Sequence, residues 1–255
     1  MPPHGSCRTG NFGRCPSAAP RMTTWGLIGS GKIGSAVARL AVAAGDDVVL
    51  SNSRGPETLA DLVAEFGPHA RAATPVEAAE AGDVVVVTIP LKAYRSVPVE
   101  PLVGKVVIDT NNYYAARDDH FPELDDGSTT SSELLQQHLP QSHVVKALNN
   151  INFLHLAELA RPARSADRSA LVIAGDDADA KARVTQLFDR LGYGTLDAGP
   201  LHEGRRFQPD TPAYGIPYFA PGADLSKVDA ARGIMPPSSP TTAADLTAAL
   251  AAFPA

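Results

Sequence analysis

The amino-acid sequence predicts an α/β protein in which helices cover both faces of a doubly wound, parallel sheet. Short apolar runs alternate along the chain with segments of helical periodicity, as in successive strand–helix–strand units. One of these runs, residues 83–89, is apolar almost without interruption. An uninterrupted apolar strand is typical of a sheet that is buried on both faces, which favours a parallel sheet over an exposed antiparallel one.

The first half of this sheet is expected between residues 23 and 112. Apolar runs predict strands at residues 25–28, 48–50, 83–89 and 106–108. One helix carries an apolar stripe from Ile33 to Ala44 and ends at Gly45, and a second begins at Pro56 and ends at Gly67. Thr74 and Glu77 form a capping box that begins a third helix.

The second half begins with another capping box, formed by Thr130 and Glu133. Further strands are expected at residues 144–148, 170–174 and 193–197, with helices at 153–160 and about 178–191. Either Asp176 or Asp177 is expected to cap the last of these helices. After Gly199 the chain is rich in Pro and Gly, so we expect irregular structure there until a short Ala/Leu helix near the end.

Three parts of the chain are expected from this pattern. Residues 22–148 form the strand–helix domain, and residues 149–255 form a smaller, substrate-side α/β portion with an irregular extension. Residues 1–21 contain both cysteines, Cys7 and Cys15, and no acidic residue. We interpret them as a disordered tail or as a mis-assigned start, with translation from Met22, and a transit peptide is an alternative.

Composition excludes several classes of partner. The net charge is −6, and no basic stripe interleaved with aromatic residues is present, so a nucleic-acid partner is not expected. No apolar run reaches the roughly 18 residues that a membrane span requires, so no membrane partner is expected either. Neither cysteine lies in the folded part, which fits the reducing cytoplasm.

The strand at 25–28 runs directly into the motif Gly29-Ser-Gly-Lys-Ile-Gly34. A G-x-G-x-x-G motif between a strand and a helix is the fingerprint of a Rossmann-type dinucleotide site. Its first glycine, Gly29, permits the tight turn, Gly31 allows the backbone to approach the pyrophosphate, and Gly34 allows close packing of helix on strand. The N–H groups of Ser30 to Ile33 would then face the phosphates. The alternative is a strand–turn–helix that binds nothing.

The end of the second expected strand indicates which dinucleotide is bound. Sites that prefer NAD place an Asp or Glu there to accept hydrogen bonds from the ribose hydroxyls. This chain has Ser53 and Arg54 instead. A hydroxyl and a guanidinium suit the 2′-phosphate of NADP(H), so we expect NADPH to be preferred over NADH. The alternative is that Arg54 is a solvated loop charge.

The chain resembles the NADPH-dependent reductases of the deazaflavin coenzyme F-420, the NADP oxidoreductase, coenzyme F-420-dependent family. The resemblance covers roughly residues 23–206. It rests on the segments 26–34, 53–54, 87–90, 144–148, 175–177 and 197–201, of which the last two are the most specific.

The resemblance implies a set of cofactor-binding residues in addition to the glycines. It implies Ser30, Gly31, Lys32 and Ile33 at the pyrophosphate, Ser53 and Arg54 at the 2′-phosphate, Ile89 and Pro90 beside the ribose and nicotinamide, and Ala147 near the ring where the deazaflavin stacks. The chain departs from the family at residues 55–58, which lack a second basic residue, and again after Arg206. The resemblance also implies a homodimer.

The implied reaction is hydride transfer between NADP(H) and the deazaflavin coenzyme F-420 as co-substrate. Because the two cofactors carry that chemistry, no side chain is expected as a catalytic acid or base. A structural or solvated role is expected for other conspicuous side chains, with Asn149 as the residue most suited to support the site. These conspicuous side chains are His143, Lys146, Asn149, Asn150, His202, Arg205 and Arg206. The pairs Asp125/Asp126 and Asp176/Asp177 are expected to be turn and cap residues, and no metal site is expected.

Two other functions are compatible with the sequence. The nearer one is an NADPH-dependent reductase of another small-molecule acceptor, such as a flavin, an imine or a small carbonyl compound. The other is a non-catalytic redox sensor that binds NADPH and signals through a partner.

Overall fold

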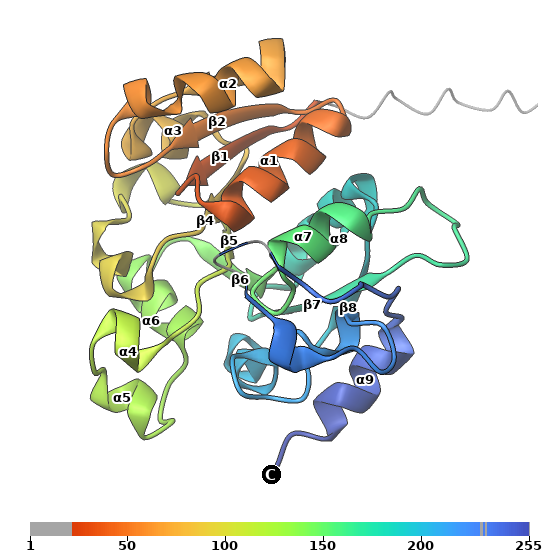
Figure 1. Ribbon diagram of the computed structural model, residues 1–255. Helices are drawn as coiled ribbons and strands as arrows, with labels where there is room; N and C mark the ends of the chain where they lie inside the picture. The colour runs from red at the N-terminus through yellow and green to blue at the C-terminus, as the bar shows by residue number, and fades with distance from the viewer. Residues whose placement is uncertain (1–21, 230–231, 233, 255) are drawn as a thin grey trace, which may run out of the picture.

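The computed structural model describes residues 22–229, 232 and 234–254. Within these residues eight strands form one sheet in the order β3-β2-β1-β4-β5-β6-β7-β8, with helices packed on both of its faces (Figure 1). The predicted α/β class with a doubly wound sheet is therefore confirmed. The expectations for residues 1–21, including Cys7 and Cys15, lie outside the described residues.

The strands are short and mostly flanked by helices. The strands are β1 (Thr24–Ile28), β2 (Asp47–Ser51), β3 (Ala70–Ala72), β4 (Val84–Val87), β5 (Val106–Asp109), β6 (His143–Ala147), β7 (Ala170–Gly175) and β8 (Gly194–Asp197). The α-helices are α1 (Lys32–Ala43), α2 (Ala60–Phe66), α3 (Pro75–Ala81), α4 (Ala115–Asp118), α5 (Pro122–Asp125), α6 (Ser131–His138), α7 (Phe153–Glu158), α8 (Ala178–Leu191) and α9 (Ala243–Ala251). Short 3-10 helices cover Pro56–Leu59, Gly67–His69, Leu91–Ser96, Glu100–Leu102, Leu201–Phe207, Ile216–Tyr218 and Leu225–Lys227.

The apolar run in β4 supplies both faces of the sheet. Val84 and Val86 join the core cluster that contains α1 and α8 side chains. Val85 and Val87 belong to the opposite cluster, which contains Leu134 and Leu135 of α6. Because successive side chains of a strand point to opposite faces, a strand with helices on both faces needs apolar residues at every position. This is the physical reason for the uninterrupted run.

Strand β7 departs from the expected parallel arrangement. Strands β1 to β6 are parallel to their neighbours, but β7 runs antiparallel to β6, with Val145 opposite Gly175. Strand β8 is again parallel to β7. The first residues of β7 lie beyond the carboxyl end of β6, so the connection through α7 stays at that end of the sheet. The chain therefore re-enters the sheet in the opposite direction, and hydropathy does not report strand direction.

Several local predictions are confirmed. Thr74 and Thr130 each accept a hydrogen bond from the backbone three residues on, completing the two expected capping boxes. Asp177, rather than Asp176, caps α8 by accepting from the Ala180 N–H at 2.7 Å. The strand expected at residues 83–89 is shorter than predicted, because it ends at Val87.

The C-terminal segment is irregular, as predicted, and ends in α9. This helix packs on β7 and β8, and its Leu246 and Leu250 are buried in the same core cluster as Trp25 of β1. The sheet is thus continuous across residue 148, where the chain passes from β6 towards β7. The division into parts at residues 22–148 and 149–255 stays a prediction.

Two absences hold for the part of the chain that the structure describes. None of its helices combines the length and the apolar character that crossing a membrane requires. Nor do its His, Cys, Asp and Glu side chains form a group of three or more that could hold a metal ion.

Candidate functional site

The glycine motif folds as a tight turn between β1 and α1. Gly29 has a φ of 108°, which only glycine adopts readily, and its N–H donates to the Ser51 carbonyl at 3.1 Å. A Cβ on Gly34 would lie 2.4 Å from the Gly29 carbonyl oxygen. The first and third glycines are therefore required by the fold itself, as the motif predicts.

Gly31 is different, because its position is open. It is the N-cap residue of α1, and apart from its chain neighbours no atom lies within 4 Å of the place where its Cβ would be. Nothing in the protein requires a glycine here, so the open position fits a bound group that approaches the backbone. The start of α1 presents N–H groups and the positive end of the helix dipole, which suit a pyrophosphate.

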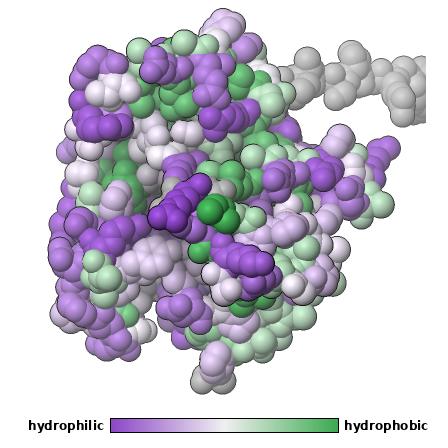
Figure 2. Space-filling view, in the orientation of Figure 1, coloured by the Kyte–Doolittle hydropathy of each residue, from purple (hydrophilic) through white to green (hydrophobic). Residues whose placement is uncertain are grey.

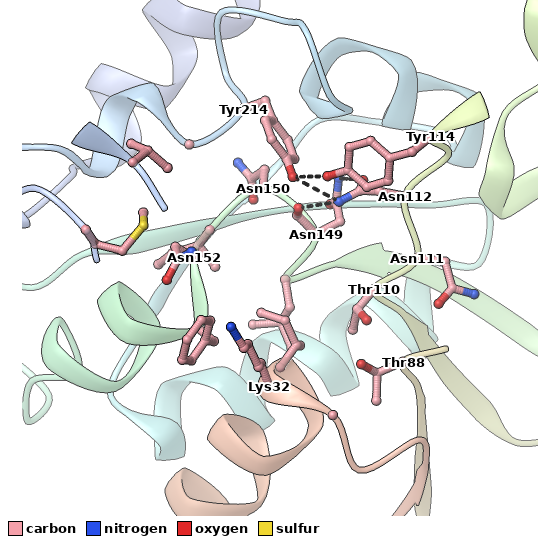
Figure 3. A pocket seen from close by; sticks show the side chains of 18 of the residues that line it. Lys32, Thr88, Thr110, Asn111, Asn112, Tyr114, Asn149, Asn150, Asn152 and Tyr214 are labelled. Atoms are coloured by element: carbon pink, nitrogen blue, oxygen red, sulfur yellow. Dashed lines mark hydrogen bonds between the residues drawn. The ribbon is translucent and has the colours of Figure 1, made fainter. Parts of the chain in front are cut away.

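A cavity of about 590 Å³ begins at this turn. It lies at the carboxyl ends of β4, β5 and β6, the edge where open α/β sheets bind ligands. The cavity is lined by residues between Gly31 and Met235 that are far apart in the sequence, and Figure 3 shows most of their side chains. These are Gly31, Lys32, Ile33, Thr88, Ile89, Pro90, Thr110, Asn111, Asn112, Tyr114, Arg117, Leu148, Asn149, Asn150, Ile151, Asn152, Phe153, Tyr214, Gly215, Ile216, Phe219, Leu225, Val228 and Met235.

One side of the cavity is held by hydrogen bonds between strand ends. The Ile89 N–H donates to Asn111 Oδ1 at 3.1 Å, and the Thr110 hydroxyl donates to the Val87 carbonyl at 3.2 Å. These bonds connect the segment after β4 with the segment after β5. The backbone at Ile89, which faces the cavity, is therefore fixed by a side chain of the neighbouring strand end.

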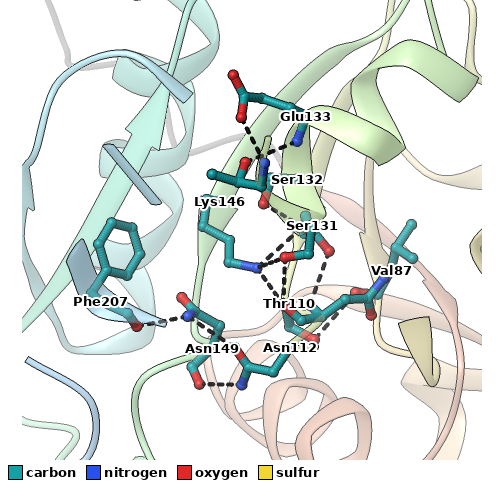
Figure 4. Close-up of polar contacts among 12 residues, drawn as sticks. Val87, Thr110, Asn112, Ser131, Ser132, Glu133, Lys146, Asn149 and Phe207 are labelled. Carbon is teal, nitrogen blue, oxygen red and sulfur yellow. Dashed lines mark hydrogen bonds and ion pairs between the residues drawn. The ribbon is translucent and has the colours of Figure 1, made fainter. Parts of the chain in front are cut away.

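Beneath this side lies a buried ion pair (Figure 4). Lys146 of β6 is 2% exposed and lies opposite Asp109 of β5, whose carboxylate is 3.3 Å from its Nζ. The ammonium also donates to the Asn111 carbonyl and to Ser131 Oγ. Burial lowers the pKa of Lys146, but three acceptors match the three donors of an ammonium. Lys146 thus supports the Asn111 segment from below and does not line the cavity.

The amides that follow β6 attach the C-terminal segment to the cavity. Asn149 Nδ2 donates to the Phe207 carbonyl at 2.9 Å, and Asn150 Nδ2 donates to the Ala213 carbonyl at 2.9 Å. The Gly215 N–H returns a bond to the Asn150 carbonyl. Asn149 therefore supports the cavity indirectly. Together with Asn150 it places Tyr214 and the residues after it against the cavity.

Leu148 begins this connection in a rare conformation. Its φ of 62° is in the left-handed region, which residues other than glycine seldom adopt. Such a conformation costs about 1 kcal/mol or more and is often found at ligand sites. Here it turns the chain out of β6, so that Leu148 and the three asparagines after it border the cavity.

Several apolar side chains of the C-terminal segment remain exposed around the cavity. Ile216, Leu225 and Val228 line it and are 55%, 44% and 41% exposed. Near the centre of the face shown in Figure 2, strongly apolar and strongly hydrophilic residues lie next to each other. This part of the wall is suited to the flat, apolar face of a ring system.

The predicted cofactor residues fall into four groups. Gly31, Lys32, Ile33, Ile89 and Pro90 line the cavity. Gly29 and Gly34 build the turn, and the hydroxyl of Ser30 donates to the Ser51 carbonyl at 2.8 Å. Ser53 and Arg54 are exposed at the end of β2 and do not line the cavity. Ala147 is fully buried in the core, and its neighbour Leu148 lines the cavity in its place.

The conspicuous charged residues have other partners. His143 lies 3.3 Å from Asp177, His202 lies 3.6 Å from Glu133, and Arg206 pairs with Glu203 at 3.0 Å. Arg205 lines a second, more polar cavity of about 360 Å³. In the acidic pairs, Asp125 accepts from Tyr113, Asp126 from Ser128, Asp176 from Leu201 and Asp177 from Ala180.

Sequence reasoning missed both tyrosines and Asn112 on the substrate side of the cavity. Asn112, Tyr114 and Tyr214 meet there although Tyr114 and Tyr214 are 100 positions apart. Asn112 and Tyr114 lie a few residues after the strand predicted at 106–108, which is a usable signal for a ligand-facing edge. Tyr214 carries no such signal, because it lies in an irregular segment whose path depends on tertiary contacts.

The fold and this cavity define the class of protein: a Rossmann-type oxidoreductase. A family model described as NADP oxidoreductase, coenzyme F-420-dependent, matches residues 24–113. The match covers about a third of the chain and confirms, for these residues, the resemblance drawn from the motifs.

Three relatives extend the comparison. The chain is 30% identical over 201 residues to Metalloreductase STEAP3 of Rattus norvegicus, which is 78% of this chain but only 38% of that protein's length. A hypothetical protein from Sinorhizobium meliloti has a solved structure with 31% identity and a TM-score of 0.64, covering 74% of this chain and 91% of its own. A presumptive F-420-dependent NADP reductase from an Arthrobacter strain is 24% identical with a TM-score of 0.61, covering 72% of this chain and 88% of its own, and shows the shared fold.

Proposed function

We propose that the protein transfers a hydride between NADP(H) and the deazaflavin coenzyme F-420. The observation that carries the proposal is the form of the cavity, which joins the glycine turn to a compartment with aromatic and aliphatic walls. Its volume of about 590 Å³ lies in the range of cofactor sites. The family model that matches residues 24–113 supports NADP(H) as the nucleotide.

The residues of the chain would hold the nucleotide in the following way. The N–H groups at the start of α1 and Lys32 would bind the pyrophosphate. Ser53 and Arg54, exposed at the end of β2, would bind the 2′-phosphate, for which an exposed guanidinium is suited. Ile89 and Pro90, whose backbone is fixed by Asn111, would lie against the ribose and nicotinamide.

The lining residues favour a reaction between two ring systems. No carboxylate, histidine or cysteine is among the residues given above as the cavity lining, in the part of the chain that the structure describes. When both cofactors are bound, they supply the chemistry, which is hydride transfer from C4 of the nicotinamide to C5 of the deazaflavin. The protein has to bring the rings together and exclude water. Phe153, Phe219 and Val228 provide apolar surface for both tasks.

The test is to mix purified protein with NADPH and the oxidised deazaflavin and to follow the absorbance of both. Equal rates of NADPH oxidation and deazaflavin reduction are the expected result. Flavin mononucleotide serves as the parallel acceptor. If NADPH binds but the deazaflavin is not reduced, the proposed acceptor is wrong.

A second candidate function is the reduction of another acceptor by NADPH, such as a flavin. The 30% identity to a metalloreductase favours it, because that protein's name gives a different acceptor. Turnover with flavin mononucleotide in the same assay, without deazaflavin reduction, would support this alternative. Binding of NADPH with no turnover of any acceptor would instead support a sensor.

A further inference from the structure

Two tyrosines from distant segments meet at the cavity wall. Tyr114 follows β5, and Tyr214 belongs to the C-terminal segment that Asn150 holds in place. Their hydroxyl oxygens are 2.5 Å apart, and both side chains line the cavity. In Figure 3 the pair lies on the opposite side of the view from Lys32. The pair therefore belongs to the substrate side of the cavity and not to the nucleotide side.

The position of the pair is set by an amide with a defined orientation. Asn112 Nδ2 donates to the Asn149 carbonyl at 2.8 Å, and Asn112 Oδ1 accepts from Asn149 Nδ2 at 3.2 Å. With its orientation determined in this way, Asn112 Nδ2 also donates to the Tyr214 hydroxyl oxygen at 3.4 Å. The Arg117 guanidinium lies 4.8 Å from the centre of the Tyr114 ring and keeps that ring in place.

A count of protons shows what the pair offers to a ligand. Two phenols carry two O–H protons, and the bond between them uses one. Asn112 donates to the pair, so it takes none. Within the described residues, these contacts leave one O–H proton for a third group. Burial and the bond to Tyr114 raise the pKa of Tyr214, so this hydroxyl stays protonated and acts as a donor, not as a base.

We propose that Tyr114 and Tyr214 act as a unit that donates one hydrogen bond to the hydride acceptor and so selects acceptors with a hydrogen-bond acceptor on the ring edge. The partner atom is a carbonyl oxygen or an unprotonated ring nitrogen. Deazaflavins and flavins carry both groups on their pyrimidinedione edge, whereas a bare metal ion carries neither. This inference rests on the proposed function, because it deepens the description of the same site.

The tyrosine pair should affect the two ligands differently. The glycine turn and Arg54 lie away from the tyrosines, so loss of the hydroxyls weakens acceptor binding and leaves NADPH binding unchanged. If the pair had a purely structural role, loss of the hydroxyls would instead weaken the binding of both the acceptor and NADPH, because Tyr214 helps to hold the C-terminal wall. The two roles are therefore separable by measuring both ligands.

The experiment uses the full chain with Tyr114→Phe, Tyr214→Phe and the double substitution. Tyr113→Phe is the matched control, because the Tyr113 hydroxyl bonds to Asp125 at 2.5 Å and does not line this cavity. Three quantities are measured: the Kd of NADPH, the steady-state kcat and KM for the oxidised deazaflavin, and the Kd of the deazaflavin for the protein saturated with NADP+, from its fluorescence.

We expect the double substitution to raise the KM and Kd of the deazaflavin about tenfold, the effect of one net hydrogen bond. The Kd of NADPH and the kcat should change less than about twofold, and the control should match the wild type.

An unchanged deazaflavin KM, or a parallel loss of NADPH affinity, would overturn the inference while the proposed function stands. If the wild type binds the deazaflavin without turnover, the proposed function fails and the Kd values decide the inference. If the wild type does not bind it, both fail.

Discussion

At the scale of the residue, Gly31 separates binding from folding. Its Cβ position is open, so a Cβ there meets no protein atom outside its immediate chain neighbours. We expect Gly31→Val to lower NADPH affinity by more than about a hundredfold, because two or more charge-assisted phosphate bonds are lost. The free energy of unfolding should fall by no more than about 1 kcal/mol, the cost of a poorer N-cap. Nucleotide titration and urea unfolding of the same preparation check both parts.

Gly34 provides the contrasting variant, because a Cβ there would lie 2.9 Å from Thr88 Cγ2 and closer still to the Gly29 carbonyl. Gly34→Val should therefore lower the free energy of unfolding by about 1–3 kcal/mol, as overpacking does. If Gly31→Val retains NADPH affinity, the turn is not the phosphate site.

Arg54 determines the choice of nucleotide in our proposal. It is exposed, so its loss removes a ligand contact and no internal packing. Arg54→Ala should lower NADPH affinity about tenfold to a hundredfold, the range for one charge-assisted hydrogen bond, and leave NADH affinity unchanged. Titration with both nucleotides measures this, and Arg39→Ala, an exposed arginine paired with Glu65, is the control. Equal wild-type affinity for NADPH and NADH would refute the assignment.

Individual residues were predictable where a local rule applies to them. The turn at Gly29 and the close packing at Gly34 follow from the steric demands of the motif, and the structure has both. Tyr214 could not be predicted, because it reaches the cavity only through amide bonds from the segment after β6. Ala147 is buried, and the left-handed conformation of its neighbour Leu148 places Leu148 at the cavity, which no local rule predicts.

At the scale of the element, β5 and β6 are joined by a buried ion pair. Removing only the cation leaves Asp109 buried with an uncompensated charge, although Ser132 still donates to it at 2.5 Å. We expect Lys146→Met to lower the free energy of unfolding by about 3 kcal/mol or more. Urea unfolding followed by circular dichroism measures the change.

The double substitution Lys146→Met with Asp109→Asn tests the cause. It removes both charges, so it should recover a substantial part of the lost stability, because a neutral side chain costs less to bury. Equal losses in the single and double variants would show that Lys146 contributes packing and not charge.

Helices and strands were predictable where a local sequence pattern, such as a capping box or an apolar run, marks them. The capped helices were predictable because both partners of each capping box, Thr74 with Glu77 and Thr130 with Glu133, lie within four residues. Strand β3 was missed, because Ala-Arg-Ala has neither apolar length nor alternation and exists through pairing with β2. The direction of β7 could not be predicted, because an apolar run packs equally well in either direction.

At the scale of the whole molecule, one core runs from β1 to the C-terminal helix. The cluster that contains Trp25 also contains Leu171 of β7 and Leu246 of α9. The expected boundary at residue 148 therefore falls inside a continuous sheet and a shared core. This arrangement gives the two-part prediction a direct test, because separate domains unfold in separate transitions, whereas a shared core unfolds cooperatively.

Trp25 is the only tryptophan in the sequence and is fully buried in β1, so its fluorescence reports the unfolding of β1 in the N-terminal half. We expect Leu246→Ala in α9 to lower the free energy of unfolding by about 2–5 kcal/mol, the usual cost of truncating a buried leucine. The Trp25 transition should move with the circular dichroism transition, because the loss at α9 is shared through the core. Leu225→Ala, at a position 44% exposed, should have a much smaller effect. A Trp25 transition that stays in place while the dichroism transition moves would instead establish two independently folding parts.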